Sequence, residues 1–259
     1  MRTYAIVNRK GGVGKTTTAI ELAFILATSC GQRVLLCDMD SQGNATEVLM
    51  PRHEGVAGMA EALRYDLEYY PDVIHGTEIN GLDIIPATEA LGDFELECTI
   101  GRTTPDFSRI RNLVECIAGD GEYDAVVFDC PPYYSISCIS ALAACDSIII
   151  PAGVDAYSTV GMNDLVRQID NIRQACPKVK VAGVLVTQWR NSDIAHDAVE
   201  ILRSDSPVPV FRTVIRRSDK AVESSWSRMA VGQLSPFSAA ARDYRTWVAE
   251  LLAKEDAAK

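Results

Sequence analysis

Short apolar runs alternate along the chain with longer stretches in which apolar residues recur every three or four positions. The runs are typical of strands buried on both faces of a sheet, and the stretches are typical of helices packed on such a sheet. We predict strands at Thr3–Asn8, Arg33–Cys37, Leu82–Ile85, Ala125–Phe128, Ser147–Ile150, Val179–Thr187 and Val208–Thr213. We predict helices at Thr16–Ser29, Ala57–Tyr70, Pro105–Ala118, Ile136–Ala144, Ser158–Ala175, Asp193–Arg203, 218–226 and 238–253.

Strands and helices alternate throughout, and no repeat or linker interrupts them. The pattern therefore predicts one doubly wound α/β sheet, mostly parallel, with helices on both faces. Residues 1–259 should form a single domain, with the C-terminal helices over 235–253 packed on it. Ligands of such sheets bind beyond the carboxyl ends of the strands. Four polar segments lie at these ends and should converge: 10–16, Asp38–Asn44, Asp129–Pro132 and Thr187–Asn191.

Residues 8–18 read Asn-Arg-Lys-Gly-Gly-Val-Gly-Lys-Thr-Thr-Thr, between a predicted strand and a predicted helix. The common phosphate-loop motif has glycine where this chain has Arg9, so the loop is a variant. Its glycines permit a tight turn that brings N–H groups to a polyphosphate, and the helix N-terminus adds further donors. Lys15 should lie on the β and γ oxygens, and the Thr16 hydroxyl should bind Mg²⁺. The loop residues expected to bind nucleotide are Gly11, Gly12, Val13, Gly14, Lys15, Thr16 and Thr17.

Carboxylates follow two of the predicted strands. Asp38 and Asp40, two residues apart, can both point toward one Mg-phosphate centre, where one holds a metal-bound water and the other positions the attacking water. Asp129 ends a continuous apolar strand, a pattern typical of a carboxylate that reaches Mg²⁺ through water. Thr16, Asp38 and Asp129 are the predicted metal set. Taken singly, each acidic segment also fits a solvated turn or an ordinary strand end.

The run Lys-Gly-Gly-Val-Gly-Lys-Thr-Thr, with its extra lysine Lys10, resembles the deviant Walker A motif of the ParA/MinD ATPases. Asp38–Asn44 resembles the family's D-x-D-P-Q-G-N box, with Ser41 in place of proline. Asp129–Pro132 resembles its D-x-P-P segment, followed by Tyr133 where a small residue is more usual. Segments 213–218 and 235–245 resemble later family motifs, so the resemblance covers about residues 3–252. It implies a short, chromosomal-type ParA partition ATPase.

By this resemblance the cofactors are ATP and Mg²⁺, and Lys10 crosses a homodimer to the partner's nucleotide. Asp40 is then needed for hydrolysis, so Lys10, Lys15 and Asp40 are the catalytic set. Arg216, together with the 187–191 segment, is expected near the adenine base. The implied partners are non-specific DNA and a ParB-like centromere-binding protein, without stable membrane association. The implied location is cytoplasmic and nucleoid-associated.

The net charge of −10 opposes non-specific nucleic-acid binding by the monomer as a whole. Segment 212–228 nevertheless holds five basic and two acidic residues, a local net charge of +3. Such a patch is typical of phosphate-backbone contact, although a solvated helix flank has the same pattern. No base-reading module is apparent, so binding should be independent of sequence and sensitive to salt. The predicted DNA contacts are Arg190, Arg216, Arg217 and Lys220.

The remaining composition narrows the alternatives. None of the eight cysteines forms a Cys-x-x-Cys pair, so zinc and disulfide frameworks are unsupported, and reduced thiols in a cytosolic protein are expected. A strand begins almost at once, so no signal peptide is expected, and no apolar run is long enough to span a bilayer. The apolar stripe of the last helix fits core packing better than membrane binding. Four rivals stay open: a MinD-like positioning ATPase, a nitrogenase-type iron protein, an amidotransferase-like ligase and a structural DNA scaffold.

Overall fold

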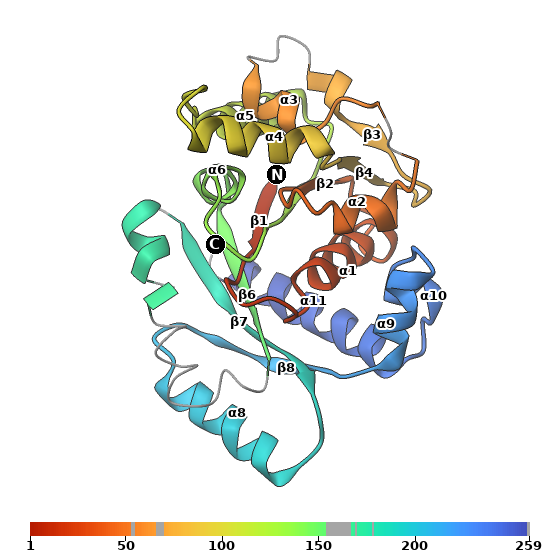
Figure 1. Ribbon diagram of the computed structural model, residues 1–259. Helices are drawn as coiled ribbons and strands as arrows, with labels where there is room; N and C mark the ends of the chain where they lie inside the picture. The colour runs from red at the N-terminus through yellow and green to blue at the C-terminus, as the bar shows by residue number, and fades with distance from the viewer. Residues whose placement is uncertain (53–54, 66–69, 154–166, 169, 178, 258–259) are drawn as a thin grey trace.

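The computed structural model describes residues 1–52, 55–65, 70–153, 167–168, 170–177 and 179–257. Its eight-stranded sheet has the order β3-β4-β2-β5-β1-β6-β7-β8 (Figure 1). All neighbouring strands are parallel except β3 and β4. The strands are β1 (Arg2–Ile6), β2 (Val34–Asp38), β3 (His75–Gly76), β4 (Leu82–Ile85), β5 (Ala125–Asp129), β6 (Ser147–Ala152), β7 (Lys180–Trp189) and β8 (Val210–Arg216).

Helices cover both faces of the sheet, which confirms the predicted fold class (Figure 1). One face carries α1 (Lys15–Thr28), α2 (Asn44–Leu49) and α11 (Ala239–Ala257). The other carries α3 (Met59–Arg64), α4 (Glu89–Thr99), α5 (Arg109–Asp120), α6 (Ile136–Ala144), the helical residues 167–168 and 170–175, and α8 (Asp193–Asp205). A 3₁₀ turn, η1 (Tyr70–Val73), and two short helices, α9 (Asp219–Trp226) and α10 (Val231–Leu234), complete the described elements.

Several predicted boundaries were wrong. Of the helix predicted at Ala57–Tyr70, the described residues show only α3, which ends at Arg64 because Tyr65 adopts an extended conformation. The helix predicted from Pro105 begins only at Arg109, after a turn in which Asp106 accepts hydrogen bonds from the amide and hydroxyl groups of Ser108. Most of the helix predicted at Ser158–Ala175 lies outside the described residues, which show helix over 167–175 apart from 169. The elements α4, α10 and β3 were not predicted.

The end predicted at Ile150 for the strand that begins at Ser147 was wrong, because β6 continues through Pro151 to Ala152. The amide of Val7 donates to the carbonyl of Ile149, so the backbone of every second residue of β6 faces β1. Pairing between β1 and β6 extends only to Ile6 and Ile149. The missing N–H of Pro151 therefore lies where no neighbouring strand needs a donor.

The last helix, α11, uses its apolar stripe in the core, as predicted. Tyr244, Trp247, Val248 and Leu251 are buried in the cluster that contains β1 and α1. Trp247 packs edge-on against Phe211 of β8, with the ring centroids 5.9 Å apart. In the part of the chain that the structure describes, no helix is long and apolar enough to cross a bilayer.

A buried carboxylate joins the helix after the first loop to the C-terminal segment. Both oxygens of Glu21 on α1 accept a hydrogen bond from the amide of Gly232, at 3.2 Å each. A Cβ at residue 232 would lie 2.7 Å from the Phe24 ring, so a larger residue would require that ring to move. Burial raises the pKa of Glu21 to about 7, against the lowering effects of the Gly232 and Val231 amides and of Arg245.

This raised pKa predicts a pH-dependent stability. The folded protein binds the Glu21 proton more tightly than the unfolded chain, so the stabilisation is full below the unfolded pKa and is lost as the pH rises through 7. Between about pH 5.5 and pH 8, the wild-type free energy of unfolding should fall by about 2 kcal/mol more than that of Glu21→Gln, measured by urea denaturation. Glu122→Gln, at an exposed site, should follow the wild-type profile. Parallel profiles for wild type and Glu21→Gln would contradict the assignment.

Candidate functional site

The four polar segments at the carboxyl ends of strands do converge, and three of them begin within the strand itself. Strands β2, β5 and β1 are neighbours, and Asp129 at the end of β5 pairs in register with both Asp38 of β2 and Ile6 of β1. All four segments line one cavity of about 740 Å³. From them come Gly11, Gly12, Gly14, Lys15, Thr16, Asp40, Gln42, Asn44, Pro132, Thr187 and Gln188.

The phosphate loop is fixed through its carbonyl oxygens. Lys15 donates from Nζ to the carbonyl of Lys10 at 3.0 Å, and Thr187 donates from Oγ1 to the carbonyl of Val13 at 2.8 Å. The side-chain amide of Gln188 donates to the carbonyl of Gly12. Gly12 and Gly14 have φ values of 73° and 82°, a left-handed conformation that glycine adopts without strain. The end of β7 thus supports the loop from behind.

The amide groups of the same loop have no such partners. From Gly11 to Thr17, no backbone N–H donates a hydrogen bond to a described residue. The loop and the first turn of α1 line the cavity, so their donors and the positive end of the helix dipole are available to an anion there. This arrangement of occupied carbonyls and unoccupied amides is suited to an anion such as a phosphate.

Asp38 and Asp40 are both buried, but they make different contacts. Asp38 accepts from the amide and hydroxyl of Thr46, at 2.9 and 2.7 Å, and from the amide of Asp40 at 3.2 Å. Asp40 accepts from the amide of Gln42 at 3.0 Å and lines the cavity. Asp38 is therefore anchored inside the protein, whereas Asp40 is placed on the cavity wall.

Asp129 is only 1% exposed, and neither of its carboxylate oxygens accepts a hydrogen bond within 3.5 Å from a described residue. Burial first, and then the charge of Asp38, raises the pKa of Asp129 well above its usual range, while the nearby Thr16 hydroxyl and Lys15 lower it. An unpartnered buried carboxylate is costly unless a cation accompanies it. The donor set of Thr16, Asp129 and Asp38 therefore fits Mg²⁺, which takes one or two carboxylates together with substrate phosphates.

The protein supplies too few ligands to hold that ion alone. Among the described residues, no three His, Cys, Asp or Glu side chains are grouped as a metal site. Lys15 provides a fixed cation at the same place. Burial lowers its pKa, and the charges of Asp129 and Asp40 partly offset that shift. The site thus combines the positive charge of Lys15 with the negative charges of Asp129 and Asp40, which suits an anion bound together with a metal ion.

The other end of the cavity is built from the end of β8 and from α9. Arg216 and Arg217 line it, as do Val222 and Trp226 on α9 and Tyr244 on α11. Sequence reasoning placed Arg216 here but missed the last three side chains, which come from elements without a recognisable nucleotide motif. Tyr133 also lines the cavity, so the unusual residue after the Asp129–Pro132 segment lies directly on the wall.

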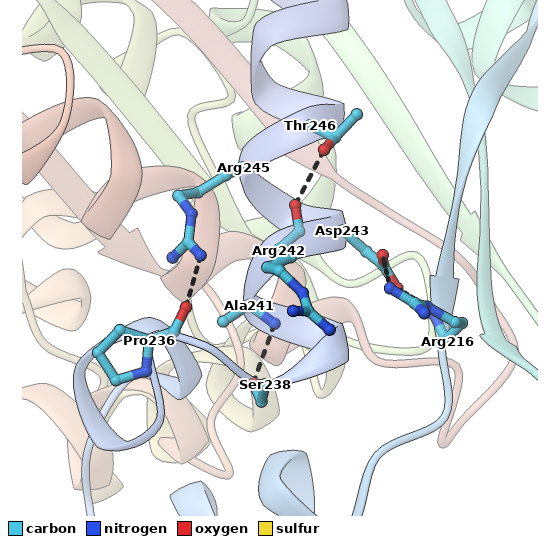
Figure 2. Close-up of polar contacts among 8 residues, drawn as sticks. All are labelled: Arg216, Pro236, Ser238, Ala241, Arg242, Asp243, Arg245 and Thr246. Atoms are coloured by element: carbon cyan, nitrogen blue, oxygen red, sulfur yellow. Dashed lines mark hydrogen bonds and ion pairs between the residues drawn. The ribbon is translucent and has the colours of Figure 1, made fainter.

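The net positive charge of the predicted basic patch is smaller in the folded protein than the count over residues 212–228 suggests. Arg216 forms a two-pronged ion pair with Asp243, with contacts at 2.8 and 2.6 Å (Figure 2). Lys220 pairs with Glu223 at 2.6 Å. Arg228 pairs with Glu47 of α2 at 3.2 Å. The local charge of +3 was therefore an overestimate, because Asp243 and Glu47 reach the segment from elsewhere in the fold.

Two of the predicted DNA contacts keep their charge exposed. Arg190 and Arg217 follow the ends of β7 and β8, and the Arg217 amide donates to the carbonyl of Trp189 at 2.9 Å. No ion pair joins either arginine to another described residue. Arg242 on α11 is also exposed, and its guanidinium makes no contact with the residues drawn in Figure 2. These three arginines, 190, 217 and 242, are called the exposed arginines below.

Comparison with known proteins agrees with this geometry. A family model described as an AAA domain matches residues 1–181. The chromosome partitioning protein ParA of Myxococcus xanthus is 38% identical over 225 residues, which are 86% of this chain and 77% of that protein. The chromosome-partitioning ATPase Soj of Thermus thermophilus is 34% identical over 257 residues, 98% of this chain and 96% of that protein.

A solved structure shows the same fold. Cobyrinic acid a,c-diamide synthase from Mycobacterium smegmatis, crystallised with an ATP analogue and magnesium, has a TM-score of 0.78 and 27% identity. The match covers 100% of this chain and 97% of that one. The partition proteins are 34–38% identical to this chain against 27% for the synthase, which favours them over the ligase rival. The chain belongs to the ParA/Soj family of chromosome-partitioning ATPases, within the ParA/MinD superfamily.

Proposed function

We propose that this chain binds ATP with Mg²⁺, closes into a homodimer over two nucleotides, and in that state holds DNA without sequence preference. The observation that carries the proposal is the loop beside the cavity, whose carbonyls are bonded by other side chains while the amides of Gly11 to Thr17 bond no described residue. Hydrolysis then returns the protein to a monomer that releases DNA. This cycle would segregate plasmid or chromosomal DNA.

Each residue of the site has a task in this proposal. Lys15 would leave the Lys10 carbonyl for the β and γ oxygens, which its position inside the loop permits. Thr16, Asp129 and Asp38 would hold Mg²⁺, which neutralises charge on the transferring phosphoryl group when bound. Asp40, on the cavity wall, would orient the attacking water. Arg216 and the end of β7 would surround the base.

Lys10 is exposed in the loop, where a second copy of the chain would have access to it. A cation donated across a twofold interface would stabilise the charge that develops on the partner's phosphates. Dimerisation would also bring together two sets of exposed arginines. A protein with a net charge of −10 needs such a concentrated surface to hold a phosphate backbone.

The partner expected to stimulate hydrolysis is a ParB-like centromere-binding protein, and the expected location is the nucleoid. The MinD-like alternative requires a membrane-binding surface. The apolar stripe of α11, the sequence feature that suggested it, is buried against β8 and α1. Binding to DNA is therefore favoured over binding to a membrane.

The first prediction concerns nucleotide affinity. Lys15→Ala removes the one buried ammonium group of the phosphate loop, so binding of ADP and ATP should weaken by about 100-fold or more. Isothermal titration calorimetry measures the loss. Lys180→Ala, at the far end of β7, is the matched control and should bind like wild type. Retained affinity in Lys15→Ala would remove the site assignment.

The second prediction separates closure from hydrolysis. Asp40→Ala should still dimerise with ATP and Mg²⁺ but lose about 10²-fold or more of its turnover, because the attacking water is no longer positioned. Lys10→Ala should bind ATP yet stay monomeric. Light scattering after size exclusion reports the dimer, and phosphate release reports turnover. Wild-type turnover in Asp40→Ala would exclude that residue from catalysis.

The third prediction concerns the DNA surface. The double variant Arg190→Glu, Arg217→Glu should keep ATP-dependent dimerisation but lose DNA retention in mobility-shift assays. A dimer loses about four phosphate contacts, so the slope of log K against log salt should decrease by about 3 to 4. Lys180→Glu with Arg203→Glu applies the same charge change near the amino ends of β7 and β8 and should leave DNA binding intact. Equal loss in both double variants would indicate a net-charge effect rather than a surface.

A further inference from the structure

The first limb of the phosphate loop, from Asn8 to Lys10, is anchored differently from the amides that follow it. The Lys10 amide donates to the side chain of Asn8 at 2.9 Å, and Asn8 in turn donates to the carbonyl of Pro151 at 2.7 Å. The Arg9 amide donates to Oε1 of Gln168 at 3.3 Å. The backbone on which Lys10 is carried is therefore held from outside the loop.

Gln168 comes from a distant part of the chain, in the helical residues that follow β6. Its side chain is only 4% exposed. Its backbone carbonyl accepts a hydrogen bond from the Tyr134 hydroxyl at 3.2 Å. The guanidinium of Arg9 lies 5.8 Å from the centroid of the Tyr134 ring. Arg9, which precedes Lys10, thus forms a closed set of contacts with Tyr134 and Gln168.

Packing alone does not account for a glutamine at this position. The Nε2 group of Gln168 is buried and has no hydrogen-bond partner among the described residues. An unpaired buried amide is destabilising, and methionine would fill a similar volume without that cost. The contact that only a polar side chain can supply here is the bond to the Arg9 amide.

We propose that Gln168 is a positioning residue for Lys10: by holding the Arg9 peptide it fixes the direction in which Lys10 leaves its subunit. This inference rests on the proposed function, in which Lys10 serves the nucleotide of a second copy. Small displacements of such a group reduce turnover strongly, whereas the loop's own amides and Lys15 stay in place. Gln168 should therefore affect closure and turnover, but not ADP binding.

The test compares two substitutions at this position. Gln168→Met removes the acceptor and keeps the volume, so kcat and the ATP-driven dimer fraction should fall about tenfold, while ADP affinity and the unfolding midpoint stay at wild-type values. Gln168→Glu keeps an acceptor for the Arg9 amide and should recover most of the turnover. A wild-type kcat in Gln168→Met would overturn the proposal. A parallel loss of ADP affinity would also overturn it, since Gln168 would then support the loop in general.

A double-mutant cycle separates this inference from the function on which it rests. If Gln168 acts through Lys10, the variant Lys10→Ala, Gln168→Met should keep the residual turnover of Lys10→Ala, measured as phosphate release. Additive losses would show that Gln168 acts elsewhere and would overturn the proposal. Full activity of Lys10→Ala would instead contradict the proposed function. An inactive Lys10→Ala together with a normal Gln168→Met would contradict the role of Gln168 and leave the proposed function in place.

Discussion

The site depends on the way one short loop divides its backbone groups. Side chains of Lys15, Thr187 and Gln188 occupy three carbonyl oxygens, while the amides of the loop beside the cavity bond no described residue. Donors fixed before a ligand arrives need little reorganisation when it binds, which is why preorganised amides are effective at anionic centres. The long strand β7 therefore matters to the site although it carries no phosphate motif.

A second constraint follows from the strand order. Since β5 lies between β1 and β2, the carboxylates of Asp38 and Asp129 end beside each other and beside Lys15. Two buried like charges raise each other's pKa and reduce stability in the absence of a cation. The same arrangement gives a divalent ion and a triphosphate a strong electrostatic reason to bind together. The buried carboxylates thus destabilise the protein locally at the place where a bound cation would neutralise them.

The sequence pattern predicted those elements whose ends are marked by neighbouring residues in the chain. The strand, loop and helix around Lys15 were predicted because apolar runs and glycines mark their ends. The helix α4 was missed because it contains Gly92 and buries only Leu91 and Phe94, too few apolar positions for a clear stripe. The pair of Arg216 with Asp243 joins residues 27 positions apart, and the contact of Gln168 with Arg9 spans 159. Such contacts depend on the packed sheet, so sequence spacing alone could not reveal them.

The position of α11 has a consequence for biosynthesis. Tyr4 of β1 donates its hydroxyl hydrogen bond to Glu255, and Thr18 of α1 bonds Tyr244, so the first strand and the first helix meet their partners in the last helix. During translation these early elements leave the ribosome long before α11 exists. The strand and the helix that flank the nucleotide loop therefore lack these contacts until α11 has been synthesised.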